Sequence, residues 1–294
     1  MIELLIALVL AGIFAVVLFT FVNGQARFTL VQDARQEVEQ NSRGAIELMM
    51  SEIRAVPGGA ITIADPDRVQ FRLPRIWGLL CAPVAGNTAK LVFPPAQAEG
   101  AVFPSDYAAG GSWGLGVLDA SVTTSNQFGF AGVSDTTAYD AAGDATCRTG
   151  LGVDLTAAAD SNPPKALTLN LAAMPTVVGD TGDLAFLYQM VTYDVGSSSV
   201  AAGDWLRRST AANGTAQQPV AGPLSEEDDS PLTFTYYCRG AVINGADATK
   251  RPFITSIRIT AAMQSRPSTR SVLQTERDTV TVHLRNSGAI LSCP

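Results

Sequence analysis

The residues best suited to nucleophilic chemistry are Ser112 and His283. Residues 110–114 read Gly-Gly-Ser-Trp-Gly and match the G-x-S-x-G pattern of hydrolases, in which a downstream histidine activates the serine. That chemistry needs the serine on a tight turn between a strand and a helix. Here the serine lies in an aperiodic stretch rich in glycine and alanine, and the single histidine falls inside an alternating strand pattern. The sequence therefore predicts that the protein is not an enzyme.

Two aspartates, Asp180 and Asp183, are weak candidates for metal ligands, because carboxylate oxygens suit Ca²⁺. Their sequence, Asp-Thr-Gly-Asp, lacks the spacing and the final glutamate of an EF-hand loop. We interpret it as a polar turn before the next strand, and no cofactor is predicted. Asn213 begins an Asn-Gly-Thr sequon and is a weak candidate for glycosylation.

The four cysteines, Cys81, Cys147, Cys238 and Cys293, are far apart and form no CxxC motif. Zinc or haem binding is therefore not expected. An even number of cysteines beyond an apolar N-terminal segment favours two disulfides, for which three pairings are possible. We favour Cys81–Cys147, which would clamp the middle of the chain, and Cys238–Cys293, which would tie the last residues to a strand.

The charge that most constrains the protein is the carboxylate of Glu3. It precedes an uncharged apolar run from Leu4 to Val22. As a helix this run would extend about 28 Å, close to the thickness of the hydrocarbon core of a bilayer. A secretory signal would instead begin with Lys or Arg and end at a cleavage site of small residues. A carboxylate in lipid is costly unless a positive group neutralises it. We therefore expect a membrane helix whose Glu3 later meets a cation in a protein environment.

The helix is expected to continue from this membrane half, residues 1–24, into an amphipathic half, residues 25–57. Proline is absent until Pro57, which with two glycines ends the helix. Apolar and small residues recur at steps of three and four and should face the rest of the protein: Val31, Ala34, Val38, Ala45, Leu48, Met49 and Ile53. The charged residues fall largely on other faces: Arg27, Arg35, Glu37, Glu39, Arg43, Glu47 and Glu52.

Residues 58–294 are expected to form a globular head made of short strands. Alternating patterns predict strands at 68–73, 90–93, 165–171, 184–195, 204–208, 232–238, 253–263 and 278–285. An antiparallel sheet with one face buried against the amphipathic half of the helix would accommodate them, so the predicted class is α+β. The periodicity is lost between residues 94 and 164. We interpret that stretch as a long irregular insertion, an elaborated loop or a small subdomain, that either covers the edge or core of the sheet or contacts a partner.

The N-terminal sequence, MIELLIALVLAGIF, resembles that of type IV pilins and type II secretion pseudopilins. In that family an acidic residue stands fifth in the mature chain. Glu3 corresponds to it if Met1 is the third mature residue, and Gly12 then matches a frequent glycine. The leader and the first two mature residues would be absent from this chain, through trimming or through a start codon assigned too late.

The C-terminal strands strengthen the resemblance. Their order is similar to that of PilW-like minor pilins and the related J-type minor pseudopilins: VTYDV, DWLRRST, LTFTYYC, FITSIRITAAM and DTVTVHLRN. The resemblance covers the N-terminal helix and these strands, whereas residues 94–164 match nothing in the family. The fold that it implies is pilin-like.

The resemblance implies a structural subunit of a filament. A prepilin would enter the inner membrane of a bacterium, lose its leader, and be moved by the pilus assembly machinery into an extracellular filament on the cell surface. Assembly would depend on Glu3, Leu4, Leu5 and Gly12. Glu3 would pair with the N-terminal amine, often methylated, of a neighbouring pilin subunit.

Within this class we expect a minor pilin with a priming or tip role, and a major pilus subunit or a type II secretion pseudopilin are the alternatives. From a different class, the chain could be a membrane-anchored surface adhesin or sensor domain that never polymerises. Nucleic acid is not an expected partner, because the net charge is −7.

Overall fold

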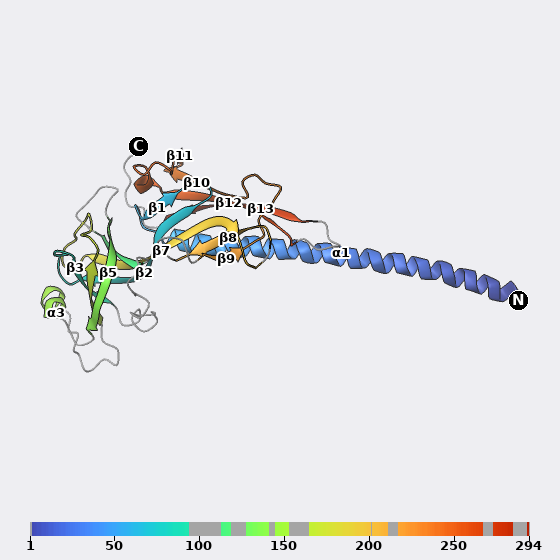
Figure 1. Ribbon diagram of the computed structural model, residues 1–294, viewed down its shortest axis with the longest axis horizontal. Coiled ribbons are helices and arrows are strands. Elements are labelled where there is room, and N and C mark those ends of the chain that lie inside the picture. Colours follow the sequence, from blue (N-terminus) through green and yellow to red (C-terminus); the bar gives the residue numbers. More distant parts are fainter. Residues whose placement is uncertain are drawn as a thin grey trace.

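A single long helix carries the N-terminus far from a β-rich head in the computed structural model (Figure 1). The structure describes residues 2–93, 113–118, 128–140, 145–152, 165–200, 202–210, 217–266, 273–284 and 293. Helix α1 runs without interruption from Ile2 to Arg54, since no proline occurs before Pro57. The chain then turns at Gly59, whose φ of 75° is a conformation that favours glycine.

The head consists mainly of antiparallel strands. In chain order they are β1 (Ile61–Ala64), β2 (Val69–Leu80), β3 (Thr88–Phe93), β4 (Trp113–Leu118), β5 (Phe128–Asp140), β6 (Lys165–Leu171), β7 (Leu184–Ser197), β8 (Asp204–Ser209), β9 (Gln217–Ala221), β10 (Leu232–Cys238), β11 (Ala241–Ile243), β12 (Ser256–Gln264) and β13 (Thr275–His283). A short helix, α3 (Ala145–Leu151), precedes β6, and a 3₁₀ turn, η1 (Arg251–Phe253), precedes β12. The α+β class is therefore confirmed.

Every strand expected from alternation is present, but the strands form two sheets where one was expected. One sheet has nine strands in the order β1-β2-β3-β6-β5-β4-β7-β8-β9, and the other has four, β11-β10-β12-β13. The strand expected at 253–263 begins only at Ser256, because residues 251–253 form η1.

The larger sheet closes on itself. Strands β2 and β7 pair along most of their length, from Val69 opposite Tyr193 to Leu79 opposite Leu184. This extra pairing joins β2, β3, β6, β5, β4 and β7 into a ring, which is a six-stranded barrel at the end of the head farthest from the N-terminus (Figure 1). A register shift between Pro74 and Ile76 bends β2 where the barrel begins. Inward-facing side chains fill the interior, among them Leu91, Leu115, Leu167 and Leu187.

The expectation of an irregular insertion at residues 94–164 is wrong for three described segments, strands β4 and β5 and helix α3. Strands β4 and β5 lie in this range, and both are members of the barrel. Leu115 and Val117 of β4 are buried in its core, as are Ala131 and Val133 of β5. Strands β4 and β5 of the insertion therefore contribute to the core of the head.

The pattern of β4 is hidden because its outward positions are glycines. A side chain at Gly114 would overlap the ring of Tyr188, and one at Gly116 would overlap the ring of Phe186. Both rings come from the neighbouring strand β7, which pairs with β4 in this register. Without polar residues between its apolar ones, β4 shows no alternation in the sequence.

A second core lies between the C-terminal half of α1 and the rest of the head. Here α1 packs on β13, β12 and β9. Four of the expected core-facing residues are buried: Val38, Ala45, Met49 and Ile53. Val31 and Ala34 are only half-buried, and Leu48 is 36% exposed, so its expected place in the core is wrong. Ser42 and Ile46 are buried in addition.

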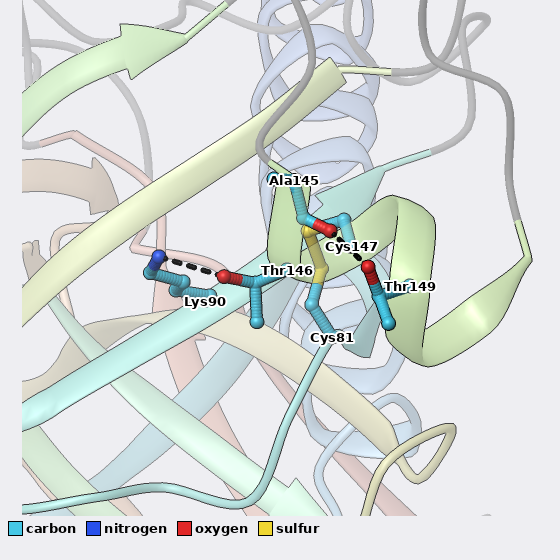
Figure 2. The surroundings of a disulfide bond; sticks show 6 residues. All are labelled: Cys81, Lys90, Ala145, Thr146, Cys147 and Thr149. Carbon is cyan, nitrogen blue, oxygen red and sulfur yellow. Dashed lines mark hydrogen bonds between the residues drawn. A yellow bond between two sulfur atoms is a disulfide. The ribbon is translucent and has the colours of Figure 1, made fainter.

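Both favoured disulfides are present. Cys81, directly after β2, is bonded to Cys147 of α3, and so ties α3 to the barrel (Figure 2). Beside it, Nζ of Lys90 donates a hydrogen bond of 3.0 Å to Oγ1 of Thr146. The second bond joins Cys238, at the end of β10, to Cys293.

Candidate assembly surface

The N-terminal half of α1 is an apolar rod that makes no contact with the described part of the head. Its exposed apolar side chains are Ile2, Leu4, Ile6, Leu8, Val9, Leu10, Ile13, Phe14, Val16, Val17, Leu18, Phe19, Phe21 and Val22. Burying one such side chain contributes about 1.5–3 kcal/mol, and soluble proteins rarely expose an apolar patch this large. The rod therefore needs lipid or protein around it. Within the part of the chain that the structure describes, α1 is the one helix long and apolar enough to cross a membrane.

The expected assembly residues lie on this rod. Glu3 is exposed in the first turn, and the side chain of Leu4 is 71% exposed. Nothing outside the helix approaches the position that a Cβ of Gly12 would occupy. Leu5 is helical, but its side chain lies outside the described residues. The acidic group and the apolar residues thus stand together near the N-terminus of α1, the end of the helix that lies far from the head (Figure 1).

The opposite end of α1 is held on the head by a largely buried ion cluster around Glu52. Arg208 on β8 donates two hydrogen bonds to this carboxylate, one of 3.0 Å from Nε to Oε2 and one of 2.7 Å from Nη2 to Oε1. Arg75 adds a weaker ion pair at 3.7 Å. Burial alone would lower the pKa of Arg208, but its hydrogen bonds and charge pairing with Glu52 outweigh burial and raise it. The arginine therefore stays charged, and the pair is a salt bridge.

The sequence pattern did not predict that Glu52 attaches the helix to the head, because Glu52 falls among the charged residues expected to face away from it. A signal was available in the tandem arginines Arg207 and Arg208. Both arginines lie in the strand expected at residues 204–208. Successive side chains of a strand point to opposite faces, so one of these two must face the core, where a charge needs a partner. A buried arginine needs an acidic partner, and the amphipathic helix supplies it.

Two further polar contacts join α1 to the head at positions nearer to the membrane half of the helix than Glu52. Oγ of Ser42 donates a short hydrogen bond to Oδ2 of Asp278 on β13. Glu37 forms a more exposed ion pair with Arg266, 3.4 Å away. Together with the cluster at Glu52, these contacts hold the helix against the head over its last five turns, which fixes the direction in which the free rod projects.

Among the described residues, the weaker candidates do not form a site. The carboxylate of Asp183 accepts a hydrogen bond of 2.7 Å from the backbone of Asp180, which is a local turn before β7. Within the described ranges, no group of three residues that could hold a metal occurs. His283 is exposed in β13, opposite Ser256. Ser112 and Asn213 lie outside the described residues.

No protein-family model, no curated protein and no solved structure matches this chain. Its own features define it as an α+β protein in which a helix long enough to span a membrane projects from a head with two disulfides. Disulfides fit a head that lies outside the cytoplasm.

Proposed function

We propose that this protein is a structural subunit of a type IV pilus-type filament, assembled through the N-terminal half of α1. The observation that carries the proposal is the continuity of α1. One uninterrupted helix is fully exposed and apolar at one end, and is bonded to the head through Glu52 at the other. A rod of this kind can pass from lipid into a bundle of like rods without any change in the head.

Glu3 selects the register of the bundle. In the inner membrane before assembly it is an unfavourable charge at the edge of the bilayer. In the filament it pairs with the N-terminal amine of a neighbouring subunit. Leaving a buried charge without its partner costs about 3–5 kcal/mol, so that registers which fail to pair it are strongly disfavoured. Leu4, Leu5 and Gly12 belong to the apolar run that packs against neighbouring rods.

Within this class we favour a PilW-like minor pilin with a priming or tip role. The support is the order of the C-terminal strands, together with a head enlarged by the barrel, which lies opposite the rod (Figure 1). A major pilus subunit and a type II secretion pseudopilin use the same rod. A non-polymerising membrane-anchored adhesin or sensor is the competing function, because an exposed apolar helix also suits a permanent anchor.

The deciding experiment recovers the protein from sheared surface filaments and compares wild type with Glu3→Ala. We expect wild type in the filaments. Glu3→Ala should insert into the membrane normally but be incorporated poorly. Asp33→Ala is the matched control, since Asp33 is an exposed acidic residue of the same helix that lies beyond the apolar run. Recovery of wild type from the membrane fraction alone would support the permanent anchor instead, and normal incorporation of Glu3→Ala would remove the pairing role.

A further inference from the structure

The edge strands of the two sheets differ in how well they are protected from pairing with another strand. In the described part of the chain the edges are β1, β9, β11 and β13. Strand β1 has four residues and a register shift between Ile61 and Ile63. Strand β9 has five residues, contains Pro219 and pairs irregularly with β8, and β11 has only three residues. Short length, irregular pairing and proline all discourage a further strand from joining these three edges.

Strand β13 has none of these three protections. It has nine residues, contains no proline, and pairs with β12 in unbroken register from His283 opposite Ser256 to Thr275 opposite Gln264. Five of its residues are threonine or valine, whose branched side chains favour strands. Strand β13 is therefore long and regular enough to pair with another strand along its free side.

The backbone groups of alternate residues of β13 point away from β12. At one end the N–H of Leu284 donates a hydrogen bond of 2.9 Å to Thr255, and at the other the carbonyl of Gln274 accepts one of 2.8 Å from Ser265. Because bonding alternates along an antiparallel pair, the even-numbered residues of β13 bond to β12. The outward N–H and C=O groups belong to exposed residues and have no partner among the described residues: Thr275, Arg277, Thr279, Thr281 and His283.

An apolar groove opens beside this edge, between β13 and α1. Its lining includes Ile46 and Met50 of α1 and Thr279 and Val280 of β13. Ile46 is buried, and Met50 and Val280 are half-buried, so the floor of the groove is apolar. A strand paired with β13 would lie about 4.8 Å from it. Every second side chain of that strand would point towards α1 and into the groove.

We propose that β13 binds an extended segment of a partner protein as an added strand of the four-stranded sheet. Backbone hydrogen bonds hold the segment, and alternate side chains determine which segment fits. Towards α1, its side chains meet Val280 and Val282 and are apolar. On the solvent side β13 presents no acidic residue, and the side chain of Arg277 is 58% exposed. Acidic and hydroxyl residues therefore suit the solvent side of the segment.

A second copy of β13 fits this edge less well. In a two-fold pair centred on Thr279 or Val280, Asp278 of each copy would face a valine of the other, and its carboxylate would lie beside apolar side chains. A pair centred on Arg277 or Asp278 would place like charges directly opposite each other. The expected partner is therefore a different sequence, in which apolar residues alternate with acidic or hydroxyl residues.

A synthetic peptide tests this edge on the full-length protein in detergent micelles. The probe is a fluorescent peptide of the same nine-residue length as β13, in which valine alternates with threonine and glutamate. We expect saturable binding by fluorescence polarisation. Binding should slow amide hydrogen exchange at Thr279 and Thr281 by about tenfold or more. The amides of Val280 and Val282 already bond to β12, so they should exchange slowly in both states and serve as the internal reference.

Methylated forms of the peptide test the backbone bonds on the unaltered protein. Successive amides of an added strand point alternately towards β13 and towards solvent. N-methylation of one alternate set of amides should therefore weaken binding by about tenfold or more. Methylation of the other set is the matched control and should leave the affinity within about twofold, because those amides bond only to water.

A pair of variants tests the same bonds from the side of the protein. Thr279→Pro removes one outward N–H and no bond to β12, and proline is tolerated where the N–H of an edge strand faces solvent. This variant should bind the unmodified peptide about tenfold more weakly. Thr279→Val keeps the N–H and a branched side chain, so it should bind with an affinity within about twofold of wild type.

Four results would overturn the proposal. They are absence of binding by the unmodified peptide, equal effects of the two methylated sets, wild-type affinity in a folded Thr279→Pro variant, and slow exchange at Thr279 and Thr281 without peptide that increases with protein concentration. The last result would assign the edge to a second copy instead of a partner. None of these measurements depends on whether the chain polymerises, so they test β13 separately from the filament function.

Discussion

The hydroxyl of Tyr193 donates a hydrogen bond of 2.7 Å to Oε2 of Glu52, and so connects the middle of β7 to the last turn of α1. The same oxygen accepts the hydrogen bond from Nε of Arg208. The carboxylate is thus shared between two strands, β7 and β8. The helix is attached to the head by a specific polar contact as well as by apolar packing.

We predict that Glu52→Gln lowers the free energy of unfolding by about 3 kcal/mol, because Arg208 is left largely buried without its counter-charge. Urea unfolding of the full-length protein in detergent would measure the change. Glu47→Gln, at an exposed position of the same helix, should change stability by less than about 0.5 kcal/mol. Equal effects of the two variants would show that the cluster does not stabilise the helix on the head.

Alkaline pH should destabilise the head through its buried tyrosines. Burial raises the pKa of Tyr193, Tyr188 and Tyr236 above the usual 10.0, and the negative charge of Glu52 adds to the effect at Tyr193. Below about pH 10 each phenol is neutral in both the folded and the unfolded state. Above it the unfolded state loses protons first, so stability falls as the pH rises.

An absorbance titration of phenolate formation would check this prediction. These three tyrosines should ionise only as the protein unfolds, in step with the loss of circular dichroism. Tyr193→Phe should remove one of the delayed ionisations. A smooth titration of all tyrosines near their usual pKa in the folded protein would contradict the prediction.

Peptide mapping without reduction should recover Cys81 linked to Cys147 and Cys238 linked to Cys293, with no free thiol. Replacing a pair by serine should cost about 2–4 kcal/mol. The two loops are of similar size, since the cysteines are separated by 66 and 55 positions in the sequence. Because Cys81 and Cys147 are also fully buried, removing that pair should cost more. A larger loss from the Cys238–Cys293 pair would contradict this order.

The glycines of β4 provide a test of the barrel. Gly114→Ala should destabilise the protein by about 1–3 kcal/mol, because the new methyl group would overlap the ring of Tyr188. Gly132→Ala, in the neighbouring strand β5, is the control, since the nearest atom to its added Cβ would be 3.9 Å away. Denaturant midpoints of the two variants would measure the difference. Similar midpoints would place Gly114 outside a packed strand.

The same packing predicts the result of a deletion. Replacing residues 100–145 by a short Gly/Ser linker removes β4 and β5, which contribute Leu115, Val117, Ala131 and Val133 to the barrel core. We expect loss of folding rather than a folded head that lacks only a surface contact. Limited proteolysis of the purified variant would distinguish these outcomes.

The sequence predicted those features that depend on local patterns. The apolar run and the absence of proline specified α1, and the alternation of apolar and polar residues specified strands such as β10 and β13. The disulfides could be predicted because a tail cysteine and a mid-chain cysteine each had a plausible partner. The N-terminal groups of the candidate surface, Glu3 and the apolar run, were equally visible in the sequence.

The barrel and the ion cluster depend on contacts between distant residues. Closure of the barrel requires β2 to pair with β7, and no local pattern reports a pairing across that distance. The role of Glu52 depends on Arg208, more than 150 residues away in the chain. The error at Leu48, which was expected in the core, has a local cause. Steps of three and four residues also include positions at the border of a helical face, and these positions remain partly exposed.

Strands β2 and β7 each pass through both cores of the head. Phe71 and Leu73 lie in the core under α1, whereas Ile76 and Leu80, further along the same strand, lie in the barrel. The backbone pairing of β2 with β7 therefore continues from the core under α1 into the barrel, so the two cores cannot separate without breaking this shared pair of strands.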